Sequence, residues 1–164
     1  MKKILLLSDT HSYIDERMLY YVSQADEVWH AGDIGNLDVI NQIQKLKPIR
    51  AVYGNIDGQE IRKIFPEINE FFCEQVKVLI THIAGYPKKY AKGIKDKLRQ
   101  SKPKVFISGH SHILKVMLDE ELQILHINPG AAGKSGFHKI RTMIRFEVEN
   151  ADIKNMEVIE LASQ

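Results

Sequence analysis

The stretch KKILLLSDTH at positions 2–11 decides how this chain folds. Four consecutive apolar residues, Ile4 to Leu7, end at Ser8 and are followed by Asp9 and His11. An apolar run of this length is typical of a buried strand in an α/β sheet, and polar side chains just beyond such a strand lie at the carboxyl edge, where these sheets place their sites. The stretch therefore predicts a strand that delivers Asp9 and His11 to a functional edge.

The same arrangement recurs at four further places in the chain. Apolar runs are followed by Gly32-Asp33, Gly54-Asn55, His82 and Gly109-His110-Ser111-His112. We expect these side chains to meet, because the carboxyl ends of parallel strands share one edge of a sheet. Asp, Asn and His without Cys exclude an iron–sulfur cluster and suit Mn, Fe, Zn or Ni in an open site. The pattern favours a centre for two metals that share one carboxylate.

Length, charge and cysteine content set the general class. With 164 residues the chain is expected to form one domain over positions 1–164. A net charge of +2 is too small to indicate a nucleic-acid or membrane partner. Cys73 is the single cysteine, so we expect a buried thiol and a reducing compartment. The N-terminal apolar run is too short for a signal peptide, which favours a cytoplasmic protein.

Hydrophobic periodicity predicts the order of elements. Strands over 4–8, 27–30 and 49–53 alternate with helices over 15–24 and 37–46, a βαβαβ start with parallel strands. Later segments predict a hairpin, one basic helix and further strands: 68–73 with 76–83, 88–100, 105–108, 114–118, 123–127, 140–149 and 155–161. The predicted class is α/β, with two mixed β-sheets packed face to face and flanked by helices in a four-layer αββα sandwich.

The ordered motifs resemble those of a known family. Asp9-x-His11, Gly32-Asp33, Gly54-Asn55-x-Asp57, His82 and Gly109-His110-x-His112 are similar to the motifs of the calcineurin-like metallophosphoesterase superfamily. The small size, with Asn128-Pro129-Gly130 after the last motif, resembles its YfcE-type phosphodiesterases. The resemblance implies the metallophosphoesterase fold and two divalent metal ions, with Mn²⁺ expected first and Ni²⁺, Zn²⁺, Fe or Mg²⁺ as alternatives.

The resemblance also implies a role for each motif residue. The first metal would be held by Asp9, His11 and His112, and the second by Asn55, His82 and His110. Asp33 would bridge both ions, and Asn55 would also touch the substrate phosphate. A hydroxide between the metals would then attack phosphorus in line. The implied activity is that of a metal-dependent phosphodiesterase acting on a phosphate ester, which can be nucleotide-like.

One position departs from the family pattern. Many members carry a His after the Gly-Asn pair that protonates the leaving oxygen, whereas this chain has Ile56. Asp57 would ordinarily orient that His, so its role here stays open, with packing or hydrogen bonding to a loop as the alternatives. General acid catalysis is worth about 10²–10⁴-fold, so its loss implies slow chemistry or good leaving groups. Should another residue donate the proton, His126 and His138 are the first candidates.

Several features leave alternatives open. His30, His126 and His138 lie outside the motifs and are expected to be structural, and Asn128 is expected to form a turn more than a phosphate contact. The basic segment Lys88 to Lys104 predicts a solvated helix face, with steering of an anionic substrate or contact with nucleic acid as the alternatives. A homo-oligomer is possible. The alternative function is a non-catalytic metal-binding scaffold like the retromer subunit of this fold.

Overall fold

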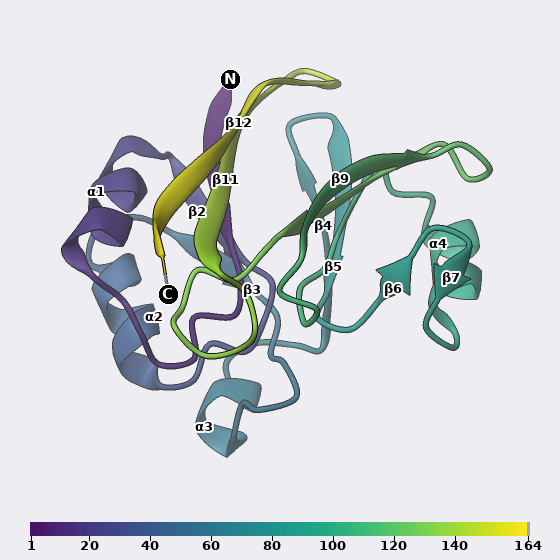
Figure 1. Cartoon of the computed structure of the whole chain (residues 1–164). Coiled ribbons are helices and arrows are strands. Elements are labelled where there is room, and N and C mark those ends of the chain that lie inside the picture. The colour runs from purple at the N-terminus through teal and green to yellow at the C-terminus, as the bar shows by residue number, and fades with distance from the viewer. Residues whose placement is uncertain (164) are drawn as a thin grey trace.

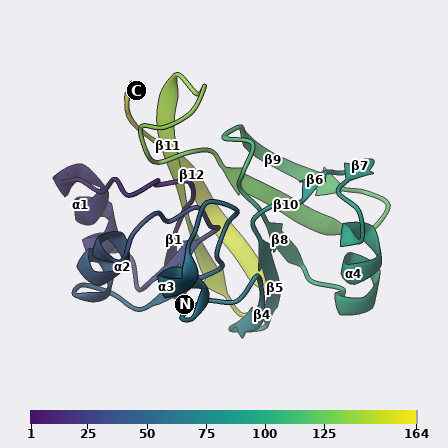
Figure 2. The ribbon, with the colours of Figure 1, turned by 90° about the horizontal axis from the view of Figure 1, so that it is seen from below.

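Two five-stranded sheets pack face to face and carry helices on their outer sides (Figures 1 and 2). The structure is a computed structural model that describes residues 1–163. The first sheet has the order β12-β11-β1-β2-β3, with bounds Asp152–Ser163, Ile140–Glu149, Lys2–Leu7, Glu27–His30 and Ile49–Ala51. The second has the order β4-β5-β8-β10-β9, with bounds Ile68–Cys73, Val76–Thr81, Val105–Ile107, Ile124–Pro129 and Leu114–Asp119. The predicted αββα sandwich is confirmed.

Helices cover the outer faces of both sheets. α1 (Glu16–Gln24) and α2 (Leu37–Gln44) lie on the first sheet, and α4 (Ile94–Ser101) lies on the side of the second (Figure 2). Both α1 and α2 begin where a polar side chain accepts a backbone N–H, since Asp15 accepts from Met18 and Asn36 accepts from Val39. The short α3 (Gln59–Arg62) follows β3.

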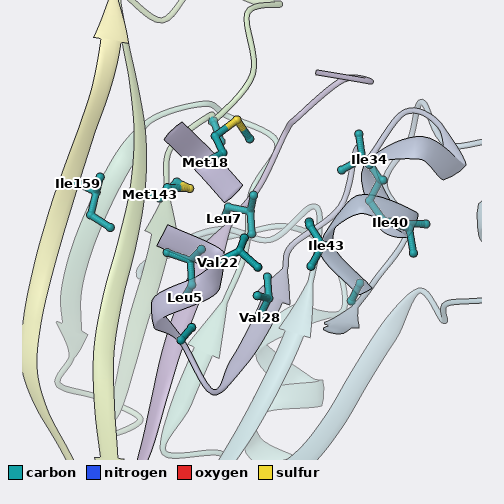
Figure 3. Close-up of a cluster of buried hydrophobic side chains, with 14 of the residues drawn as sticks. Leu5, Leu7, Met18, Val22, Val28, Ile34, Ile40, Ile43, Met143 and Ile159 are labelled. Carbon is teal, nitrogen blue, oxygen red and sulfur yellow. The ribbon is translucent and has the colours of Figure 1, made fainter. Parts of the chain in front are cut away.

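Strand β1 is apolar from Ile4 to Leu7 because both faces of this part of the strand are buried. Leu5 and Leu7 pack under α1 and α2 with Met18 (Figure 3), whereas Ile4 and Leu6 pack between the two sheets. A strand of a sheet with covered faces has no solvent side, so its sequence does not alternate. This explains why the length of the apolar run Ile4 to Leu7 indicated a strand, although apolar and polar residues do not alternate in it.

The strand directions gather five loops at one edge. β1, β2 and β3 run parallel in the first sheet, and β5 and β8 run parallel in the second. Their carboxyl ends lie at the end of the molecule opposite the N-terminus (Figure 1). Each motif of the sequence follows one of these five strands. The βαβαβ start thus places three of the motifs together, as expected, and the parallel strands of the second sheet add the other two.

The predicted helix over residues 88–100 is wrong at its start. Residues before α4 form a small hairpin instead, with β6 at Gly85–Tyr86 and β7 at Lys89–Tyr90. The Tyr90 hydroxyl donates to Asp119 Oδ2 at 2.6 Å, so a contact with β9 fixes this segment against its helical composition. Gly93, with φ of 84°, then opens α4. Local composition is overridden here by tertiary contacts.

Cys73 is buried at the end of β4, as predicted, and its thiol is free. No helix in the described residues 1–163 is long and apolar enough to cross a membrane.

Candidate metal centre

Six motif residues form two adjacent triads at this edge. Asp9, His11 and His112 make the first triad, and Asp33, His82 and His110 make the second. Within each triad, one ligand atom from every side chain lies within 4.8 Å of the others. The first triad joins the loops after β1 and β8, and the second joins the loops after β2, β5 and β8. Both sheets therefore contribute to one site.

Asn55 is the seventh residue, and it lies beside the second triad. Its Oδ1 atom is 3.1 Å from Nδ1 of His110. Asn55 comes from the loop after β3, the outermost strand of its sheet. All seven predicted site residues are thus neighbours.

The Asp33 carboxylate lies between the triads. Its Oδ2 atom is 3.4 Å from Nε2 of His11 and 3.2 Å from Nε2 of His82, which belong to different triads. In the first triad, Asp9 Oδ1 is 3.1 Å from Nε2 of His112. One oxygen of Asp33 therefore faces both halves of the centre, the placement that a bridging ligand requires.

Three buried polar atoms of the centre have no hydrogen-bond partner: Asp9 Oδ1, His11 Nε2 and His82 Nε2. Leaving such atoms unsatisfied costs free energy, and native proteins rarely do so without a functional reason. This set of oxygen and nitrogen donors, which includes no thiolate, fits a divalent cation. The residues present therefore fit two metal ions.

The electrostatics of the centre also favour cations. Burial opposes ionisation of Asp9 and Asp33, yet the neighbouring imidazoles hold the pKa of both carboxyls well below the usual range. In turn the carboxylates of Asp33 and Asp9 raise the pKa of His11 to about 9. Two ionised carboxylates thus attract positive charge into a largely buried site, where a metal ion competes with protons for His11.

The backbone of the centre is strained at its ligand positions. Asp9, His11, Asp33, His110 and His112 all have left-handed backbone conformations, with φ between 45° and 71°. Non-glycine residues seldom adopt this region, and such outliers cluster at functional sites. The sharp turns aim successive side chains back into one small volume.

The glycine before Asn55 leaves room for the Asp33 carboxylate. A Cβ atom on Gly54 would lie 2.1 Å from Oδ1 of Asp33. That same Asp33 oxygen accepts a hydrogen bond from the backbone N–H of Ile56 at 3.0 Å. The Gly54-Asn55 motif thus packs against Asp33 and fixes the orientation of its carboxylate.

Asp57 joins two loops of the centre. Its carboxylate accepts backbone N–H groups from Gly54 at 2.8 Å, from Gly35 at 2.8 Å and from Ile34 at 3.1 Å. The loops that carry Asp33 and Asn55 are therefore tied together by one buried side chain. Of the two roles left open for Asp57, hydrogen bonding to a loop is the one observed.

His30 and His82 show how the imidazoles are oriented. His82 Nδ1 is 2.7 Å from the Ala31 carbonyl, which can only accept, so Nδ1 carries the proton and Nε2 faces the site. His30 accepts from the Gly32 N–H and contacts the Thr10 hydroxyl, and burial lowers the pKa of His30 to about 4. His30 is thus a neutral structural residue, as expected.

Asn128 forms a turn and supports the last motif. Its amide donates to the Gly109 carbonyl at 3.0 Å and to Ser111 Oγ at 3.2 Å, and it accepts from the Gly130 N–H at 3.0 Å. These bonds use both ends of the side chain, in agreement with the turn expected for Asn128. His126 is also structural, because it is buried and its Nε2 lies 2.9 Å from Ser108 Oγ.

His138 is the neighbour of the centre that the sequence motifs did not reveal. Its Nδ1 atom lies 3.3 Å from Nδ1 of His112. No pattern around His138 distinguishes it from a surface residue, since it comes from the long loop between β10 and β11. Only the fold brings that loop to the motif residues.

Comparison with known proteins identifies the family. Residues 1–151 match the sequence profile of the calcineurin-like phosphoesterase superfamily domain. The chain belongs to this superfamily. A protein of Methanothermobacter thermautotrophicus named "probable metallophosphoesterase" is 28% identical over 134 residues, which cover 77% of this chain and 74% of that protein.

Solved structures of this superfamily fold agree with the architecture. Vps29 of Entamoeba histolytica, solved in complex with zinc, has a TM-score of 0.75 at 14% identity, with 98% of each chain covered. An archaeal phosphodiesterase has a TM-score of 0.72 at 23% identity, covering 97% of this chain and 99% of the other. The metallophosphoesterase fold is therefore shared by these proteins and this chain.

Proposed function

We propose that this metallophosphoesterase is a phosphodiesterase with a dinuclear metal centre. The observation that carries the proposal is the placement of Asp33 Oδ2 between His11 and His82, at 3.4 Å and 3.2 Å. The two triads then hold one ion each, with Asn55 completing the second. Two bound divalent ions supply Lewis-acid activation of water and offset the charge of the phosphoryl group.

The chain's own residues prepare the site for that chemistry. Asp33 would hold both ions, and the hydrogen bond from the Ile56 N–H keeps its carboxylate oriented. Asn55 lies beside His110 and offers an amide to a phosphate oxygen. The strained loops and the Asp57 bonds hold these groups before substrate arrives, so little reorganisation is needed in the reaction.

Charge at the rim supports a diester substrate. The ligand loops at residues 8–12, 31–35, 54–57, 82–85 and 109–113 contain no Lys or Arg. In three of these loops an exposed apolar residue directly follows a proposed ligand, with Ile56 46% exposed, Ile83 44% and Ile113 57%. We expect such a rim to suit a singly charged diester with an apolar group better than a monoester dianion.

The proposed site has no evident general acid. Ile56 replaces the family His and carries no proton, and both imidazole nitrogens of His138 have partners, Gly133 and His112. His126 is buried against Ser108. These residues therefore supply no proton to the leaving oxygen, which favours activated leaving groups.

A hydrolysis assay tests the proposal. Purified protein loaded with Mn²⁺ or Ni²⁺ should hydrolyse bis(4-nitrophenyl) phosphate faster than 4-nitrophenyl phosphate. Chelation and His82→Ala should each abolish the activity, whereas His126→Asn, away from the centre, should keep it. A preference for the monoester would contradict the diester assignment.

A non-catalytic metal-binding module is the second candidate, and Ile56 is the observation that favours it. The two candidates differ in one outcome. If two metals are bound but no mono- or diester is hydrolysed in a chelator-sensitive way, the module is correct and the phosphodiesterase is not.

A further inference from the structure

His138 contacts one proposed metal ligand from outside the motifs. Its Nδ1 atom lies 3.3 Å from Nδ1 of His112, and the two rings meet edge to face with centroids 5.1 Å apart. On its other side, Nε2 of His138 lies 2.8 Å from the Gly133 carbonyl oxygen. His138 thus connects a backbone carbonyl to the imidazole of His112.

These contacts determine where the protons lie. A carbonyl oxygen only accepts, so Nε2 of His138 carries a proton and donates it to Gly133. In the neutral imidazole, Nδ1 of His138 is then an acceptor, and the hydrogen bond to it must come from Nδ1–H of His112. His112 is left with an unprotonated Nε2, the atom that lies 3.1 Å from Asp9 Oδ1 in the first triad.

The loop that carries His138 is braced against the centre. The Gly133 N–H donates to the Asp9 carbonyl at 3.1 Å. The backbone at Gly136 passes so close to His112 that a Cβ atom there would lie 2.2 Å from its Nδ1. These contacts hold the loop against Asp9 and His112, and they thereby fix the position of His138.

We propose that His138 is a positioning residue, which holds His112 in the Nδ1–H tautomer so that Nε2 is free for the metal of the first triad. This inference rests on the proposed metal centre and adds a residue that acts through one ligand. In the second triad the Ala31 carbonyl does the same for His82 at 2.7 Å. One imidazole of the first triad, His112, is thus oriented by a side chain, and one of the second, His82, by the backbone.

Metal titration at pH 8 tests the proposal. Zn²⁺ binding, followed by calorimetry with a competing chelator, should give two sites in the natural protein. His138→Leu removes the acceptor and should weaken one site by about 10–100-fold while the other site stays unchanged. His138→Asn places an amide oxygen near the Nδ1 position, so it should restore most of the affinity. Phe137→Leu, at a fully exposed neighbour, is the matched control and should change neither site.

Side-chain ¹⁵N NMR gives a second readout that a merely structural residue would not affect. At pH 8 the metal-free protein should show His138 as the Nε2–H tautomer, and the Zn²⁺-loaded protein should show His112 protonated at Nδ1. Observation of His138 protonated at Nδ1 would overturn the proposal. So would unchanged affinities in His138→Leu, or an equal loss in His138→Asn. Because neither measurement needs hydrolysis, a protein without phosphodiesterase activity would leave this proposal standing.

Discussion

The two ends of strand β2 bury carboxylates in opposite ways. At its start, Glu27 is 6% exposed and has every partner supplied by the protein, because Trp29 and Arg50 donate to Oε1 and Lys2 donates to Oε2. At its other end, the loop with Asp33 faces His11 and His82, whose Nε2 atoms have no hydrogen-bond partner.

This difference in partners distinguishes Glu27, a structural carboxylate, from Asp33, a carboxylate available to a ligand. Burial opposes ionisation of Glu27, but bonds from Trp29 and Arg50 hold its pKa below the usual range. The Glu27 end of β2 therefore needs no partner from outside the chain, and we call it the closed end. The Asp33 end, whose neighbours lack partners, is the open end. The open end is completed only when cations enter, so the same strand contributes stability at one end and a binding site at the other.

The largest expected effect comes from removing the bridging carboxylate. Asp33→Ala should lose both metal ions together and lower diester hydrolysis by at least about 10³-fold, because charge stabilisation in both triads depends on one oxygen. Glu27→Gln at the closed end should retain two ions. The check is elemental analysis with an activity assay, and one tightly held ion in Asp33→Ala would show that Asp33 is no bridge.

The next effect comes from supplying the missing proton donor at the open end. Ile56→His would place an imidazole directly after Asn55, and poor leaving groups should then react up to about 10²-fold faster, with nitrophenyl esters barely changed. A leaving-group series on both proteins measures this. A flat dependence in the natural protein would mean that another group already donates the proton.

A third prediction concerns His126, a buried imidazole whose Nε2 lies 2.9 Å from Ser108 Oγ. Burial lowers the pKa of His126 to about 4, below the 6.5 of an unfolded chain, so its stabilising contribution is present above pH 6.5 and is lost as pH falls toward 4. Between pH 7 and 4.5 the free energy of unfolding should fall by about 2–3 kcal/mol more in the natural protein than in His126→Gln. Urea denaturation of the metal-free proteins measures it, and equal slopes would contradict it.

The smallest effect is expected at the closed end. Arg50→Met removes one donor from Glu27 but leaves Trp29 and Lys2, so we expect a loss of about 1 kcal/mol of stability, since Arg50 is partly exposed. Metal stoichiometry should not change. Thermal unfolding with elemental analysis tests both statements, and loss of metal would mean that the two ends are coupled.

The sequence predicted the site well because its signal is local and repeated. Each of Asp9, Asp33 and His82 follows a buried apolar run, and parallel strands bring such positions to one edge whatever the loops between them do. The sandwich was predictable for the same reason, since apolar runs mark strands covered on both faces.

What the sequence could not predict depends on long-range contacts. The hairpin at Gly85–Tyr90 forms where composition favours helix, because Tyr90 is held by Asp119 of β9. His138 reaches His112 through a loop that carries no motif. In the sequence, Asp57 stands where the family has the carboxylate that orients the missing His. Only its three backbone hydrogen bonds show that it joins two loops.

The left-handed backbone at Asp9, His11, Asp33, His110 and His112 has a consequence for evolution of this chain in the laboratory. Each such residue costs on the order of 1–3 kcal/mol that glycine would avoid. A library selected only for resistance to heat or protease should therefore accumulate glycine at these five positions. The recovered variants would be more stable than the natural protein but would bind no metal. A screen for stability must therefore also measure metal content from its first round.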